Sequence, residues 1–279
     1  MPLGMPDRFL DALSGLTAKA VVTAFLLVLP QSAWAAFSCD SGTLDTTCEV
    51  TTDQTLAEGE VVEGAGHLIV RNGGVIRTNQ AEKARMEMGG DITVEDGGLI
   101  RANLSLLQAA NLTLEGDQGN GGGRIDVSGW GYRGGSQRQG GGGPGGGSDS
   151  TYRSGGGAGH GGGGGEGHPG AGSGGGAGGS EYGDHEAPTA LGSGGGGGSY
   201  AAGGHGGGAV RLQVGGTLMV DGAIAADGYA GGNSDWDAGG GGAGGSIWVD
   251  AGILAGSGGI HANGGDGGSQ GSGAGGGGA

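Results

Sequence analysis

Basic residues are scarce in this sequence. Its 279 residues include 12 Lys or Arg against 28 Asp or Glu, which gives a formal net charge of −16. A surface this acidic repels phosphate backbones, so we expect no nucleic-acid partner and no docking on anionic membranes. A P-loop needs a lysine directly after its glycines, and no lysine follows Lys83, which excludes that phosphate-binding mechanism.

Proline and cysteine are also few. With six prolines and no persistent Gly-X-Y register, the chain is not a collagen, although 83 of its residues are glycine. The two cysteines are Cys39 and Cys48. In an exported protein such a pair is expected to form one disulfide, which here would pin the start of the domain.

Closely spaced metal ligands are missing as well. The histidines of the glycine-rich tract, such as His160 and His205, lack the tight pairing of zinc ligands, so we expect polar side chains on a solvated surface. The nonapeptide register of calcium-binding glycine repeats does not recur. We therefore predict no cofactor, while Ca²⁺ bound by carboxylates and carbonyls of the turns stays open as an alternative.

The N-terminus has the pattern of an export signal, which we place at residues 1–35. Arg8 and Lys19 supply positive charge, Ala20–Pro30 is apolar, and Ala33–Ala35 has the small-x-small form of a cleavage site. The apolar stretch is too short to span a bilayer as a helix. We predict a secreted or extracellular protein, attached to the cell surface or free, with no transmembrane segment in the mature chain.

Short apolar runs separated by turn residues recur from residue 36 to 133. Val70–Asn79 aligns with Val94–Asn103 at an offset of 24 residues. From residue 209 to 279 the pattern returns, with Val210 aligned to Ile247 and Ile224 to Ile260 at offsets of 37 and 36. Strands this short cannot bury a face alone, so the repeats predict an all-β solenoid in which one coil stacks on the next.

Glycine makes up half of residues 134–208, and no apolar run interrupts this low-complexity tract. Disorder is one interpretation, because little in the tract offsets the entropy of ordering glycine. The other is an inserted lobe of polyproline-II-like or irregular segments packed as closely as only glycine allows. The chain also reaches Ala279 inside a glycine-rich excursion without a capping strand, and solenoids need caps, which favours a longer natural protein or a truncated C-terminal part.

The sequence resembles uncharacterised glycine-rich exported and surface proteins of bacteria and archaea that have parallel β-helix repeats. The segments that carry the resemblance are Ser41–Cys48, Ile125–Gly129, Ala187–Gly194, Gly245–Val249 and Ile260–Gly265. The resemblance implies a right-handed parallel β-helix with glycine-rich insertions, often within larger surface proteins. It supplies no catalytic or binding residues, so none are carried over.

The densest polar cluster of the glycine tract is the candidate binding site. It comprises Glu181, Tyr182, Asp184, His185 and Glu186, and the aromatic Trp236 of a later glycine excursion joins it as a candidate. A rigid glycine scaffold could present such a loop to a partner, while an ordinary exposed turn is the competing interpretation. Aromatic residues among small polar ones suit contact with glycans or proteins.

These observations predict a non-catalytic, adhesin-like structural protein with a β-solenoid stem and a displayed glycine lobe. Its partners would be extracellular glycans or other cell-surface components. The alternative is a β-helix polysaccharide-active enzyme or carbohydrate-binding module, for which Arg71, Arg77, Glu95 and Arg101 fall on aligned coils. A minor alternative is ice binding by a glycine-rich face. We expect no enzymatic activity and no catalytic residues.

Overall fold

A computed structural model describes residues 37–168, 174–269 and 278. These residues form an all-β structure. This part of the chain contains no helix that is long and apolar enough to cross a membrane. All the described residues belong to one compact unit, Ala36–Ala279. The predicted signal peptide lies outside the described residues.

Sixteen strands are found among the described residues, and most of them are short. In chain order they are β1 Ser41–Gly42, β2 Thr47–Val50, β3 Asp53–Leu56, β4 Val61–Gly64, β5 His67–Val70, β6 Val75–Thr78, β7 Lys83–Met88, β8 Ile92–Val94, β9 Leu99–Arg101, β10 Asn103–Ala109, β11 Leu112–Leu114, β12 Arg124–Asp126, β13 Ala209–Val220, β14 Ala223–Ala225, β15 Ser246–Ala255 and β16 Gly259–His261.

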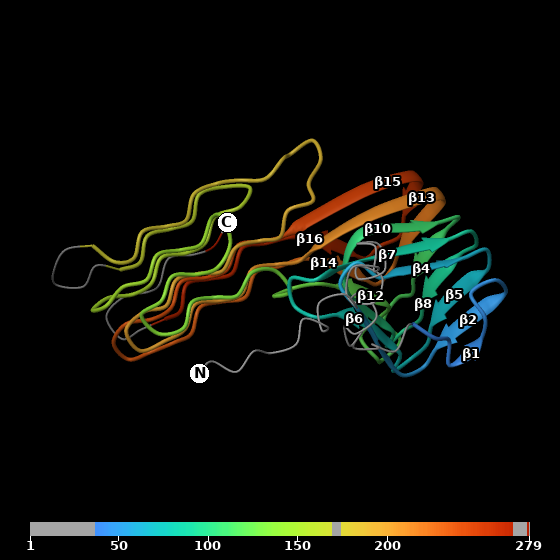
Figure 1. Cartoon of the computed structure of the whole chain (residues 1–279), viewed down its shortest axis with the longest axis horizontal. Helices are drawn as coiled ribbons and strands as arrows, with labels where there is room; N and C mark the ends of the chain where they lie inside the picture. Colours follow the sequence, from blue (N-terminus) through green and yellow to red (C-terminus); the bar gives the residue numbers. More distant parts are fainter. Residues whose placement is uncertain (1–36, 169–173, 270–277, 279) are drawn as a thin grey trace, which may run out of the picture. The chain divides into compact units, whose positions relative to one another are not determined.

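The strands form two sheets (Figure 1). One has the order β1-β2-β5-β8-β11-β13-β10-β7-β4, with β15 also paired to β13; the other has the order β16-β14-β12-β9-β6-β3. Every pair is parallel except β1–β2. Apart from β1 and β2, strands that are neighbours in sequence therefore lie in different ladders, and each pairs with a strand from the preceding or following repeat.

The strand register confirms the sequence alignments. Val70 pairs with Val94 and Val75 with Leu99, which is the predicted offset of 24 residues. Val210 pairs with Ile247, and Ile224 pairs with Ile260. The apolar pattern of one repeat thus lies directly over that of the next.

This register builds stacks of aliphatic side chains along the core. One stack runs through Leu68, Ile92, Leu112 and Leu218, all fully buried, and a second through Ile76, Ile100, Ile125 and Ile224, also fully buried. Burying each such side chain contributes roughly 1.5–3 kcal/mol relative to leaving it exposed. The stacks end on the outermost strands, where Leu254 is 59% and Ile260 41% exposed.

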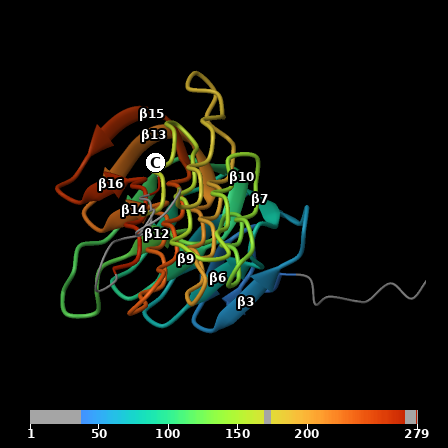
Figure 2. The ribbon, with the colours of Figure 1, turned by 90° about the vertical axis from the view of Figure 1, so that its left-hand side faces the viewer.

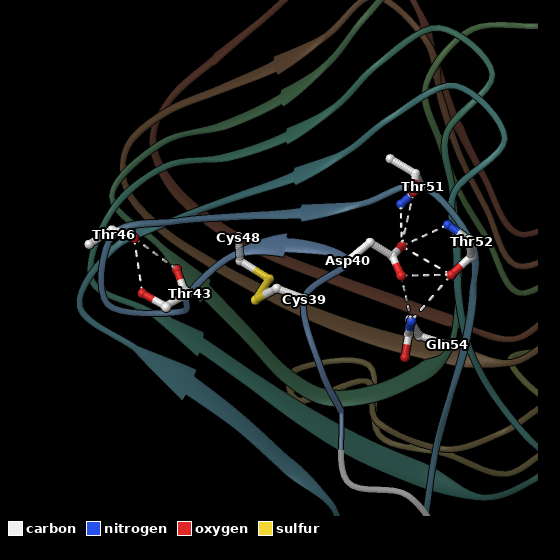
Figure 3. Close-up of a disulfide and its surroundings, with 8 residues drawn as sticks. All are labelled: Cys39, Asp40, Thr43, Thr46, Cys48, Thr51, Thr52 and Gln54. Carbon is white, nitrogen blue, oxygen red and sulfur yellow. Dashed lines mark hydrogen bonds between the residues drawn. A yellow bond between two sulfur atoms is a disulfide. The ribbon is translucent and has the colours of Figure 1, made fainter.

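A disulfide closes the opposite edge, next to β1 and β2. Cys39 and Cys48 are bonded as predicted (Figure 3). Beside them the Asp40 carboxylate accepts hydrogen bonds from the backbone N–H groups of Thr51, at 2.6 Å, and Thr52, at 2.9 Å. These bonds, that from Thr51 first, hold the pKa of Asp40 below its ordinary value. The pair and the carboxylate together fasten the start of the described chain to the turn after β2.

Three glycine-rich excursions leave the strands, after β12, β14 and β16 respectively. We call their described residues together, 127–168, 174–208, 226–245 and 262–269, the glycine lobe (Figures 1 and 2). The lobe is joined throughout by backbone hydrogen bonds between separate segments, for example from Gly204 to Gly240 and from Gly240 to Gly196, each 2.9 Å. The described part of the tract thus adopts the ordered alternative.

Hydrogen bonds in the lobe's interior repeat every three residues. Gly192, Gly195 and Gly198 donate to Gly207, Gly204 and Ala201, which lie on one neighbouring segment running the opposite way. Between these donors, Gly194 and Gly197 donate to Gly142 and Gln139 on a different neighbour, and Gly196 donates to Gly156 on a third. One extended segment is therefore bonded on several sides, whereas a β-strand bonds to neighbours on two sides only.

The first excursion leaves the sheet directly after β12. The last strand before it ends at Asp126, and Gly131 already donates its N–H to Gly206 within the lobe. At its far end, β13 begins at Ala209. Trp130 lies at the junction, where its Nε1 donates to the carbonyl of Thr78 at 3.0 Å. This bond ties the first excursion to the sheet.

Candidate functional site

A cleft of about 760 Å³ lies where the lobe meets the last strands. One wall consists of His160, Gly161, residues 181–185 and Pro188 of the first excursion. The other wall, which we call the strand side, consists of residues 244–247 and 260–262 at the start of β15 and the end of β16. The loop 181–188 belongs to the first excursion, whereas residues 244–247 enter β15 and residues 260–262 leave β16. Three distant parts of the sequence thus build one concave surface.

Four of the six predicted binding residues line this cleft. They are Glu181, Tyr182, Asp184 and His185. Glu186 follows them in the loop without lining the cleft, and Trp236 lies in the turn 233–237 of the second excursion, outside it. The structure therefore gathers the core of the predicted cluster at a cavity and leaves two members apart.

Tyr182 is fixed at the base of the loop. Its hydroxyl donates to the carbonyl of Leu191 and accepts a 2.9 Å hydrogen bond from Ser193 Oγ. Burial raises the pKa of the phenol, and the bond from Ser193 opposes this only in part. Since both polar partners come from the following segment, the ring is held in place and its hydroxyl stays protonated at neutral pH.

His160 packs against Tyr182, with ring centroids 4.8 Å apart and planes tilted by 50°. Its Nδ1 lies 2.9 Å from the carbonyl oxygen of Gly244, which can only accept, so Nδ1 carries the proton. The residue is buried, which corrects the expectation of a solvated side chain, and burial lowers the pKa of the imidazole. The bond links the first excursion to the second, 84 residues away.

Asp184 shapes the outer part of the loop. Its Oδ1 accepts hydrogen bonds from the backbone N–H groups of Glu186, at 2.8 Å, and Ala187, at 3.2 Å. These two bonds, that from Glu186 first, lower the pKa of the carboxyl group. Gly183 supports the same turn with a φ of 98°, in the left-handed region that favours glycine. The loop thus keeps its form with the Asp184 carboxylate ionised.

The strand side of the cleft contributes residues that the sequence did not single out. His261 Nδ1 lies 2.8 Å from Asp227 Oδ2, a carboxylate of the preceding repeat. Ser246 Oγ donates to the carbonyl of Ala190 at 2.7 Å and so connects β15 to the loop's end. Ile247 and Ile260 supply apolar wall. Among these, the repeat alignment alone pointed to Ile247 and Ile260, as strand residues rather than as site residues.

The arrangement offers carboxylates at Glu181 and Asp184, imidazoles at His185 and His261, and an apolar floor. It can bind a ligand that combines hydroxyl or cationic groups with an apolar face. Within the described residues no group of three or more His, Cys, Asp or Glu side chains is placed to hold a metal ion. This finding assigns no residue to the Ca²⁺ alternative, in which carbonyl oxygens would also act as ligands.

The residues of the enzyme alternative form ion pairs between neighbouring repeats. Arg71 bridges Glu49 and Glu95. Arg77 pairs with Asp53 on the strand beside it. Arg101 pairs with Asp126 at 3.0 Å and lies 5.2 Å from the ring centre of Trp130. The Arg77 pair is exposed, and such a pair contributes up to about 1 kcal/mol, while the pairs of Arg71 and Arg101 are partly buried. All of them place opposite charges on neighbouring repeats.

Comparisons of the chain with protein-family models, curated proteins and solved structures give no match in any of the three. The assignment of function therefore depends on the geometry of the site and the lobe.

We predict that His160 makes the protein less stable at mildly acid pH. The folded pKa is lowered, so as pH falls through about 6.5 the unfolded chain takes up a proton before the folded one does, and stability is lost. His160→Asn keeps a donor toward Gly244 but does not titrate. Thermal unfolding at pH 7.5 and pH 5.5 should show a larger loss in melting temperature for the wild type than for the variant; equal losses would contradict the burial of a neutral imidazole.

Proposed function

We propose that this chain is a non-catalytic, secreted or cell-surface structural and adhesive protein. In this proposal the strands form a right-handed parallel β-helix stem, and the glycine lobe is a bundle of polyproline-II-like segments that the stem carries. Paired strands of neighbouring repeats are offset in sequence by 24 residues or by 36–37 residues, and these regular offsets support a stem of stacked coils. The predicted leader and the disulfide support an extracellular setting.

The three-residue period of the hydrogen bonds supports the polyproline-II-like geometry. That conformation has three residues per turn and makes no internal hydrogen bonds, so every third N–H points toward the same neighbour. Gly192, Gly195 and Gly198 follow this rule toward one segment. Close packing of such segments leaves no room for large side chains, which accounts for the glycine, alanine and serine of the buried stretches 192–199 and 238–244.

The observation that carries the proposal is the bonding of loop 181–188 into this network. Tyr182 donates its backbone N–H to His160 at 2.7 Å, and His160 is bonded to Gly244 at the entry to β15. The loop is thus held by His160 and, through His160, by the entry to β15. It therefore presents its carboxylates and His185 in one geometry, with little conformational entropy left to lose on binding. Such preorganisation suits recognition of a partner by a displayed surface.

The test is binding without turnover. The full chain, exported by its expression host, is applied to an array of extracellular glycans, and the same glycans are assayed for new reducing ends or unsaturated products. We expect binding and no products. His185→Ala and Glu181→Ala should weaken binding at the cleft, whereas Glu186→Ala, in the same loop but outside the cleft, should leave it unchanged. Absence of binding, or equal effects of all three, would overturn the proposed site.

A polysaccharide-active enzyme is the second candidate, because paired charges and a cleft with carboxylates occur in the same molecule. Product formation in the array assay would support it. If Arg101→Ala then abolished that activity, the ion-pair ladder would carry chemistry, and the non-catalytic proposal would fail. Arg77→Ala, which breaks a comparable pair on the neighbouring strand, serves as the matched control.

A further inference from the structure

The turns at the ends of the excursions expose aromatic side chains. Tyr152 is 74%, Tyr200 56% and Trp236 72% exposed, one on each of three turns. Each of these turns reverses a segment that runs out from the strands and back. The three turns therefore lie toward the end of the lobe remote from the strands (Figure 1). We call residues 149–153, 198–201 and 233–237 the aromatic tip.

Hydrogen bonds hold these turns against one another. Ser199 Oγ donates to the carbonyl of Thr151 at 2.9 Å, and the Ser199 N–H donates to Arg153 at 3.3 Å. The third turn is attached where it returns, since Ala238 N–H donates to Ser154 Oγ at 3.3 Å and Gly155 N–H donates to Ala238 at 2.9 Å. The three aromatic residues therefore sit on one fixed base and not on independent loops.

The surroundings of the three rings are polar and nearly balanced in charge. The residues of the tip include three aspartates, Asp149, Asp235 and Asp237, and one arginine, Arg153. Arg138, whose N–H donates to Gly198, adds a second basic residue beside the tip, so three acidic residues stand against two basic ones. Serine and threonine hydroxyls lie between them. Binding to a membrane surface would call for a continuous apolar patch with an excess of basic residues, and binding to an anionic polymer would call for an excess of basic residues. The residues of the tip supply neither feature.

We propose that the aromatic tip binds uncharged polysaccharide, with Tyr152, Tyr200 and Trp236 stacking on successive sugar rings. The C–H face of a pyranose is apolar while its rim carries hydroxyl groups, so an aromatic ring flanked by polar side chains matches both. Rigid aromatic side chains offer this contact area at low entropic cost. The inference rests on the proposed adhesive function and gives it a second contact, distinct from the cleft.

The test is retardation of the full chain in native gels that contain hydroxyethylcellulose, glucomannan or dextran, with polygalacturonate as the anionic comparison. We expect retardation by at least one neutral polymer and none by polygalacturonate. Trp236→Ala, Tyr152→Ala and Tyr200→Ala should each weaken the interaction about fivefold, and Trp236→Phe, which keeps a ring, should restore most of it. Tyr229→Ala removes a half-exposed tyrosine outside the tip and should change nothing.

Each other outcome counts against the aromatic tip in a recognisable way. No retardation by any neutral polymer overturns it, as does stronger retardation by polygalacturonate. Retardation lost in His185→Ala but kept in the three tip variants assigns glycan binding to the cleft; the adhesive function then stands while this inference fails. If Trp236→Ala instead abolishes self-association seen by light scattering, the tip contacts protein, which also overturns it. Unchanged melting temperatures of the variants show that folding is not the cause.

Discussion

Replacing Gly240 by alanine is expected to lower the free energy of unfolding by about 3 kcal/mol, the upper end of the range for overpacking. Gly240 donates its N–H to Gly196 and accepts from Gly204, so segments lie on two sides of it. A Cβ at this position would overlap the backbone carbonyl of Gly156 on a third side. A carbonyl inside a hydrogen-bonded bundle cannot move aside as a side chain can.

Gly163→Ala is the matched control. It lies in the same lobe, and the nearest atom to an added Cβ is the Gly179 oxygen at 4.0 Å, an ordinary contact. Because alanine restricts the unfolded chain more than glycine does, this variant should gain roughly 0.4–1 kcal/mol. Thermal and denaturant unfolding of both variants would measure the difference. If Gly240→Ala proved as stable as Gly163→Ala, close packing of the lobe would be refuted.

Replacing Asn103 by alanine is expected to lower the free energy of unfolding by about 3 kcal/mol, because it leaves the buried N–H of Ala209 unpaired at the junction of sheet and lobe. The side chain is fully buried. Its Oδ1 accepts the N–H of Ala209 at 3.0 Å, where the chain re-enters the sheet, and its Nδ2 donates to the carbonyls of Glu82 and Trp130. Alanine would leave the Ala209 N–H without this acceptor and open a small cavity.

Asn111 provides the comparison. Its Oδ1 accepts the N–H of Thr217 at 2.8 Å, again 106 residues along the chain, but this bond is exposed. Water replaces a lost partner there, so Asn111→Ala should cost no more than about 1 kcal/mol. Equal losses in melting temperature for the two variants would argue against a buried junction. Both asparagines begin N-x-Ser/Thr sequons, and burial makes Asn103 inaccessible for glycosylation in the folded protein.

The strand stack could be predicted because its signal is local. Alternating apolar residues and a repeated Asn/Asp-Gly-Gly turn placed Val70 over Val94, and the register agrees. The single pair of cysteines left one partner for each, and Cys39 is bonded to Cys48. Both inferences use side chains whose burial or bonding depends on spacing within one or two repeats.

The lobe gave no comparable signal. Its interior is bonded through backbone groups, which every residue carries, so a bond such as Gly204 to Gly240 leaves no pattern of side chains. We placed the start of the glycine-rich tract at 134 because the sequence of 127–133 retains apolar and aromatic residues, although Gly131 and Tyr132 already donate to Gly206 and Gly192 of the lobe.

The candidate site shows both limits. The cluster Glu181–His185 could be found because polar residues stand out within a glycine tract, and it lines the cleft. His160 and His261 could not be assigned to it. His160 lies apart from the cluster within the same excursion and His261 ends β16, and their partners, Gly244 and Asp227, are 84 and 34 residues away along the chain. Long-range backbone packing decided which histidines became part of the site.

Hydrogen exchange at the glycine amides, followed by NMR on the full chain, tests the central claim that stem and lobe are one ordered body. The donors of 192–198 and 239–245 are bonded inside the lobe, so their protection should approach that of the amides in β10 and β13. Gly161 and Gly163, toward the lobe's surface, should exchange faster. If the interior glycines exchanged at the rate of an unfolded chain while β10 and β13 stayed protected, the lobe would be disordered and the account of it as a display scaffold would be wrong.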